Sequence, residues 1–246
     1  MRFPSAYGLE AVAAAMAFRE TGDPFPGFAE RRPDLRIGLC SSLSAGYLHD
    51  LIETVRHRPD APSMAFVEGR PDAVVAGVRR GELDLALAPE RRDWRGLEHE
   101  VLWRDPLMLA VPERHILARE PEIMPSALQG ERILVAVGAH ERDVSLDLIE
   151  RLNPAWTACA APIEVERETL LGLVGLEFGV ALVTGACTGD VHPGVVCRPL
   201  APPVRALDFH AVWRPRSHDP ALSRFLNAAR TLRLAREAEA SNDDGR

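Results

Sequence analysis

The sequence predicts an α/β protein built from two similar lobes. Short apolar stretches that read as strands alternate with amphipathic stretches that read as helices, a pattern typical of parallel sheets with right-handed crossovers. The order strand, helix, strand, helix, strand starts at Leu35 and starts again after Pro112. Two copies of one plan within 246 residues fit two lobes better than one continuous sheet.

The first copy begins with the strand LRIGL and the helix GYLHDLIETVRHR. Strand SMAFVEG, helix PDAVVAGVRRG and strand LDLALAP follow. Pro71 suits the first turn of the second helix, and Gly81 suits its end. The first helix should bury one face, because its apolar residues recur at helical spacing: Tyr47, Leu48, Leu51, Ile52 and Val55.

The stretch LEHEVLWRDPLMLAVP predicts two extended segments before the second copy. That copy reads as strand ERILVAVG, helix LDLIERL, strand APIEVERE, a helix that ends at Gly179, and strand VALVTGA. LDFHAVWRP is a late strand. A C-terminal amphipathic helix follows, with Asp219 as its N-cap and Pro220 at its first position.

Composition excludes several classes of function. The net charge of -7 argues against broad nonspecific binding of DNA or anionic membranes, although a local basic patch stays open. The four cysteines form no CxxC pair and no zinc spacing, so we expect reduced thiols in a cytoplasmic protein without metal or cofactor. AVAAAMAF resembles a weak signal-peptide core, but alanine at this density favours a helix, and a periplasmic location is the alternative.

Motifs that would indicate an enzyme are missing from the sequence. It contains no G-x-S-x-G elbow, Walker loop, G-x-G-x-x-G or H-E-x-x-H. Asp84, near the start of LDLALAP, has the carboxylate of a catalytic acid, but we expect it to bond backbone or helix N–H groups. The sequence therefore predicts a protein that is not an enzyme.

Residues 33–235 resemble the effector-binding region of LysR-type transcriptional regulators. The resemblance rests on an ordered set of stretches: PDLRIGL, EGRPDAVVAGVRRGELDLAL, LWRDPLMLAVPERHILARE, ETLLGLVGLEFGVALVTGA, PGVVCRPL and HAVWRPRSHDPALSRFLNAARTL. It implies a fold like type 2 periplasmic binding proteins, with two Rossmann-like lobes joined by a two-strand hinge. It also implies a small-molecule effector between the lobes, often an organic acid or aromatic compound, and assembly into oligomers.

The resemblance also sets the expected domains. Residues 34–108 and 211–235 would form lobe I, residues 109–210 lobe II, and residues 236–246 a disordered tail. Residues 1–33 would hold a helix and linker, a remnant of the family's linker helix. Only 34 residues precede the first strand, fewer than the roughly 50 of a small domain, so we expect no winged helix-turn-helix here.

Three explanations of that difference stay open: a truncated or degenerate member, a start codon assigned too late, or a stand-alone sensor. DNA binding would then need a helix-turn-helix from upstream or from an intact relative. The alternative functions are a solute-binding protein for transport and a protein-interaction module that no longer binds ligand.

The first candidate site follows the first strand. Ligands of open α/β sheets sit beyond the carboxyl ends of strands, where helix N-termini favour anions. Ser41 and Ser42 add hydroxyl groups there, and the resemblance aligns the family's ligand-contacting serine with Ser42, next to Leu43. The competing interpretation is that these serines only cap the helix, Ser44 first among them.

Other candidates come from the remaining loops. Pro71 stands where many family members have a ligand-contacting Ser or Thr, and Arg70 could replace that contact with a charge-assisted bond. The alternative is that Arg70 is a solvated loop residue. His140 in VGAHERD could donate to a ligand or sense pH, although a loop histidine is more often simply exposed.

The stretch GLEFGVALVTGA adds two more candidates. Thr184 is expected near a strand end, as a candidate for the cleft lining. Phe178 is also a candidate, although a phenylalanine here is more typical of the core. Glu177, where the family has Gly or another small residue, should face solvent. Trp103 and Trp213 are expected in or next to the crossing strands, where packing is the default role for both and their fluorescence could also report lobe closure.

Overall fold

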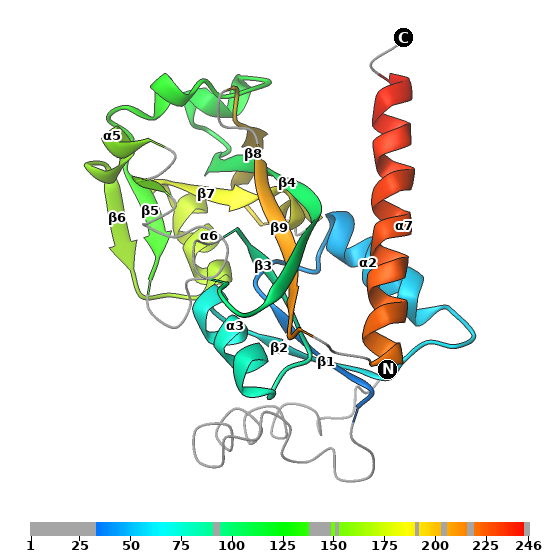
Figure 1. Cartoon of the computed structure of the whole chain (residues 1–246). Helices are drawn as coiled ribbons and strands as arrows, with labels where there is room; N and C mark the ends of the chain where they lie inside the picture. Colours follow the sequence, from blue (N-terminus) through cyan, green and yellow to red (C-terminus); the bar gives the residue numbers. More distant parts are fainter. Residues whose placement is uncertain are drawn as a thin grey trace, which may run out of the picture.

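The computed structural model describes residues 33–90, 94–137, 149–150, 153–189, 192–202, 206–215 and 219–243. The expected N-terminal helix at residues 8–20 and the loop with His140 lie outside them. Within the described residues, nine strands form one sheet in the order β2-β1-β3-β9-β4-β7-β5-β6, and β8 pairs with β4 (Figure 1).

Lobe I contains β2, β1, β3, β9 and the first part of β4. The parallel pairing of β1 with β2 and β3 confirms the predicted parallel sheet. The predicted face of α2 is buried, apart from the half-buried Ile52. Pro71 opens α3, and Gly81 ends it with a φ of 77°. The elements are β1 (Leu35–Leu39), α2 (Gly46–Arg56), β2 (Met64–Glu68), α3 (Pro71–Arg80) and β3 (Leu85–Pro89).

Lobe II contains the last part of β4 with β7, β5, β6 and β8. Strand β5 runs parallel to β6 and β7, as the repeated plan predicts. Its elements are η1 (Ile116–Arg119), η2 (Pro125–Leu128), β5 (Ile133–Ala136), α5 (Pro154–Thr157), β6 (Ala160–Ile163), α6 (Arg167–Gly175), β7 (Val180–Thr184), η4 (Gly185–Gly189) and β8 (Val195–Pro199).

Two long strands connect the lobes: β4 (Glu98–Pro112) and β9 (Ala206–Trp213). Up to Pro106, β4 pairs with β9, and from Leu107 it pairs with β7 (Figure 1). The prediction of two extended segments here was wrong, because one continuous strand with a bulge between Val101 and Trp103 serves both lobes. The two-lobed fold is confirmed, and the lobe limits at residues 108 and 210 stay a proposal.

Helix α7 (Pro220–Asp243) packs along α2 and β4 in lobe I (Figure 1). Asp219 caps it, since its carboxylate accepts a hydrogen bond of 2.7 Å from the Ala221 N–H. The expectation of a disordered tail from residue 236 was wrong for residues 236–243, which are helical. The stretch REAEA has high helix propensity, and Arg236 pairs with Asp50 of α2.

Helix α6 ends at Gly175. The prediction that it ends at Gly179 was wrong. Glu177 adopts a φ of 64°, in the left-handed region that ends helices. Glu177 is exposed, as expected, but Phe178 is 54% exposed, so its assignment to the core was wrong.

The core of lobe I holds an aromatic stack and a buried ion pair. Trp103 of β4 stacks between Tyr47 of α2, at 5.1 Å, and Phe209 of β9, at 4.7 Å. The Asp84 carboxylate accepts hydrogen bonds from the Arg36 backbone N–H and from its guanidinium, at 2.7 to 2.9 Å. Asp84 therefore bonds a backbone N–H group, as predicted, and joins β3 to β1.

Candidate functional site

A pocket of about 440 Å³ lies where lobe I faces lobe II. Lobe I contributes the carboxyl ends of β1 and β2, and lobe II contributes the first turn of α6 and the loop before β8. Sheet geometry explains the position, because ligand crevices form beyond the carboxyl ends of parallel strands. The lining residues are Leu39, Ser41, Ser42, Leu43, Glu68, Glu166, Arg167, Glu168 and His192.

The serine loop after β1 forms one wall of this pocket. Ser41 is 2% exposed, and in the described part of the chain its Oγ has no hydrogen-bond partner. A buried hydroxyl without a protein partner costs about 1 to 3 kcal/mol, so it marks a place suited to a polar ligand. Ser42 accepts from the Ser44 N–H at 3.1 Å, and its Oγ lies 2.9 Å from the Ser44 Oγ.

Ser44 connects the two lobes next to the pocket. Its Oγ donates a hydrogen bond of 2.6 Å to the carbonyl oxygen of Ala186 in η4. Gly189 of η4 also packs closely, since a Cβ there would lie 2.3 Å from the Ser44 carbonyl oxygen. The expectation that Ser44 caps α2 was wrong, because Ala45 is the N-cap and no side chain caps that helix.

The pocket lining carries more negative than positive charge among the described residues. Glu68, Glu166 and Glu168 provide three carboxylates, whereas Arg167 provides one guanidinium and His192 one imidazole. Glu68, Glu166 and Glu168 are exposed at its rim, and Arg167 and His192 are half-buried. A ligand here meets the hydroxyl groups of the serine loop on one wall and charged groups at the rim.

The structure brings together three of the predicted site residues: Ser41, Ser42 and Leu43 all line the cleft pocket. Arg70 and Pro71 open α3 after β2 but are not among the described lining residues. Thr184 ends β7, is fully buried, and has its Oγ1 3.8 Å from the Cys187 Sγ.

Two further predicted residues lie away from this pocket. Phe178 lines a different pocket, where β7 begins, and so lies at the other end of α6 from the cleft. His140 lies outside the described residues.

Sequence reasoning missed the contribution of α6 to the pocket. Glu166, Arg167 and Glu168 follow the strand AAPI, and the same carboxyl-end rule that selected the serines could have selected them. Glu68 ends β2 and follows from the same rule. His192 lies in a loop without a periodic pattern, so no sequence signal marked it.

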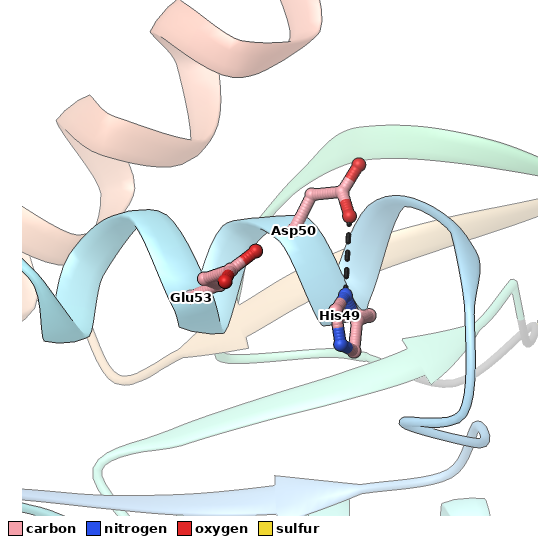
Figure 2. A group of neighbouring side chains, drawn as sticks. All are labelled: His49, Asp50 and Glu53. Carbon is pink, nitrogen blue, oxygen red and sulfur yellow. Dashed lines mark hydrogen bonds and ion pairs between the residues drawn. The ribbon is translucent and has the colours of Figure 1, made fainter.

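A separate group of possible metal ligands lies on α2. His49, Asp50 and Glu53 point outward from that helix, as Figure 2 shows, with donor atoms within 4.8 Å of one another. The His49 Nδ1 lies 3.2 Å from Asp50, which also pairs with Arg236 of α7. These groups are solvated or paired, so we assign them no metal.

Comparison with known proteins identifies the family. The sequence profile described as the LysR substrate binding domain matches residues 29–233. The chain belongs to this family. In the part of the chain that the structure describes, no helix is long and apolar enough to span a membrane.

Curated relatives of this LysR-family chain are transcriptional regulators by name. The Hca operon transcriptional activator HcaR of Escherichia coli strain K12 is 26% identical over 198 residues, 78% of this chain and 65% of its own length. The probable cat1 operon transcriptional activator of Acinetobacter lwoffii is 25% identical over 66% of this chain. The chain thus spans 65% and 55% of the lengths of these two relatives.

Solved structures of the family share the fold. The BenM effector-binding domain with its effector benzoate superimposes with a TM-score of 0.72 at 19% identity, over 82% of this chain and 93% of that one. The oxidized form of OxyR gives a TM-score of 0.63 at 24% identity, over 81% and 94%. At this identity the likeness establishes the two-lobed fold.

Proposed function

We propose that this LysR-family domain senses a small molecule bound in the cleft pocket and serves a transcriptional regulator rather than an enzyme. The observation that carries the proposal is the buried Ser41 hydroxyl in a pocket that both lobes line. A ligand that contacts both walls favours one angle between the lobes, and so can shift a conformational equilibrium. The printed names of the relatives, which are operon activators, support the regulatory role.

The lining charges bear on the class of ligand. An organic acid is the expectation from the family resemblance, and Arg167 is the guanidinium that would receive its carboxylate. Glu68, Glu166 and Glu168 oppose a compound with several negative charges. We propose a ligand with at most one carboxylate, and with hydroxyl or amino groups that bond the serines and glutamates.

The output of the proposed sensor requires contact with DNA through other residues. We propose that a helix-turn-helix domain, either upstream or on an intact relative, provides it, and that the assembly is an oligomer that works in the cytoplasm. The full-length BenM structure superimposes over 93% of this chain with a TM-score of 0.73, which supports such a context.

A thermal-shift screen tests the proposal. The folded chain is mixed with monocarboxylates, hydroxy acids, amino acids and amines, and the melting temperature is compared with that of Ser42→Ala. A ligand at 100 times its dissociation constant should stabilise the fold by about 2.7 kcal/mol. A shift that is reduced in the variant supports the cleft site. No shift with any compound would contradict it and favour a protein-interaction module.

A further inference from the structure

A second pocket lies in lobe II, outside the cleft. It has a volume of about 360 Å³. Its walls come from the segment after β4, the residues before β5, and the turn from α6 into β7; the lining residues are Pro112, Arg114, His115, Glu131, Arg132, Glu177, Phe178, Gly179 and Val180. The nine residues of α6 separate it from the cleft, because the first turn of α6 lines the cleft and the turn after its last residue lines this pocket.

The charged groups of this pocket are not neutralised in pairs. The Glu131 carboxylate lies 3.5 Å from the His115 Nε2, and the His115 Nδ1 accepts a hydrogen bond from the Leu117 N–H. Arg114 and Arg132 are exposed, and within the described residues neither guanidinium group forms a hydrogen bond or an ion pair. The lining therefore holds two guanidinium groups beside the carboxylates of Glu131 and Glu177, and a ligand carboxylate can accept hydrogen bonds from the two guanidinium groups. Guanidinium groups also match a carboxylate in geometry.

Phe178 adds an aromatic surface that the backbone holds in place. The Phe178 N–H donates to the Leu173 carbonyl oxygen at 3.0 Å, and the Glu177 N–H donates to that of Val174 at 2.9 Å. These two bonds form a Schellman motif, which normally places a glycine where Glu177 stands. Such a motif usually packs its following apolar side chain on the helix, yet Phe178 is 54% exposed beside the pocket.

We propose that this pocket is a second small-molecule site, which takes a monocarboxylate with an aromatic ring. The carboxylate would lie against Arg114 and Arg132, and the ring would stack on Phe178, where aromatic contacts add to the area that is buried. The site is separate from the cleft, because the described lining residues of the two pockets do not overlap.

The test titrates the whole chain with phenylacetate, by calorimetry and by backbone amide NMR. We expect the amide signals of Arg132 and of residues 177–180 to shift. The double variant Arg114→Gln/Arg132→Gln should raise the dissociation constant of this site about ten-fold or more, because charge-assisted bonds are lost. Phe178→Ala should also weaken binding. Cyclohexylacetate, with the same charge but no flat ring, should bind less tightly than phenylacetate.

Two control variants locate the effect. Arg119→Gln removes an exposed arginine of η1 that does not line the pocket, and should leave the titration unchanged. Ser42→Ala alters the cleft and should also leave this site unchanged, so failure here is distinguishable from failure of the cleft proposal. The proposal is overturned if phenylacetate does not bind, if shifts are confined to residues 41–43, or if the double variant binds as tightly as the original chain.

Discussion

The Ser44 hydroxyl donates a hydrogen bond of 2.6 Å to the Ala186 carbonyl oxygen and so joins the serine loop of lobe I to η4 of lobe II. The Ser44 N–H in turn donates to the Oγ of Ser42, which lines the cleft pocket. A ligand that moves Ser42 therefore acts on a residue that contacts both lobes. Gly189 permits this close approach, since any larger residue would collide with the Ser44 carbonyl.

Replacing Ser44 with Ala should lower the free energy of unfolding by about 1 kcal/mol, because one hydrogen bond between the lobes is lost. Urea unfolding measures this change. Ser126→Ala is the matched control, since that exposed serine of η2 should change the value by less than about 0.5 kcal/mol. Equal values for the two variants would show that the Ser44 bond adds nothing to stability.

Replacing Asp84 with Ala should destabilise lobe I by about 3 kcal/mol or more, because it leaves the Arg36 guanidinium buried without its carboxylate. The Arg36 side chain is 10% exposed and that of Asp84 is 16% exposed. Asp60→Ala is the control, because the Asp60 side chain is 61% exposed and surface ion pairs contribute little. A change as small as that of the control would mean that the ion pair is not formed in solution.

Replacing Glu177 with Gly should stabilise the chain by about 0.5 to 1 kcal/mol, because Gly adopts a φ of 64° without steric cost. Glu120→Gly is the control, since Glu120 has an ordinary φ of -76°. Glycine there relieves no strain and only increases the conformational entropy of the unfolded chain, which lowers stability. The free energy of unfolding should rise in the first variant and fall in the second. A fall in both would contradict the left-handed conformation of Glu177.

His210 should make stability depend on pH. It is 6% exposed, and in the described part of the chain neither ring nitrogen has a hydrogen-bond partner. Burial lowers its pKa below the ordinary value of about 6.5; the charge of His99 acts in the same direction, and Glu90 and Asp208 oppose it. The unfolded chain therefore takes up a proton before the folded chain does. The free energy of unfolding should be highest above pH 6.5 and fall as the pH drops below it.

In His210→Phe the free energy of unfolding should depend less on pH. The difference should lie between the pKa of the imidazole in the folded chain and its higher pKa in the unfolded chain. His49→Gln serves as the control, because His49 is an exposed residue of α2. Unfolding curves recorded from pH 8 down to pH 5 compare the three proteins. An unchanged slope in His210→Phe would assign the pH dependence to other groups.

Local signals predicted much of lobe I. Pro71 and Gly81 mark the ends of α3, and a periodic apolar pattern marks the buried face of α2. These features depend on neighbours in the chain, so the sequence carries them. The continuity of β4 was not predictable in this way, because its pairing with β9 and β7 joins segments far apart in the sequence.

In the candidate site too, residues marked by local sequence were predicted and residues placed by contacts between the lobes were not. Ser41 and Ser42 follow a strand and precede a helix, so a general rule for open sheets selected them. Ser44 was expected to cap α2, but its hydroxyl group donates a hydrogen bond to the Ala186 carbonyl oxygen of the other lobe. The packing of the two lobes brings the first turn of α6 opposite the serines, so local sequence did not indicate it. The assignment of Phe178 to the core was wrong because α6 ends early and Phe178 then faces outward.

The most direct test of the effector site is a calorimetric titration of the best compound from the screen against the original chain, Ser42→Ala and Ser126→Ala. We expect one binding event in the cleft. Its affinity should be about ten-fold weaker in Ser42→Ala, because one hydrogen bond to the ligand is lost, and unchanged in Ser126→Ala. Equal affinity for all three proteins would contradict the assignment of the cleft pocket as the effector site.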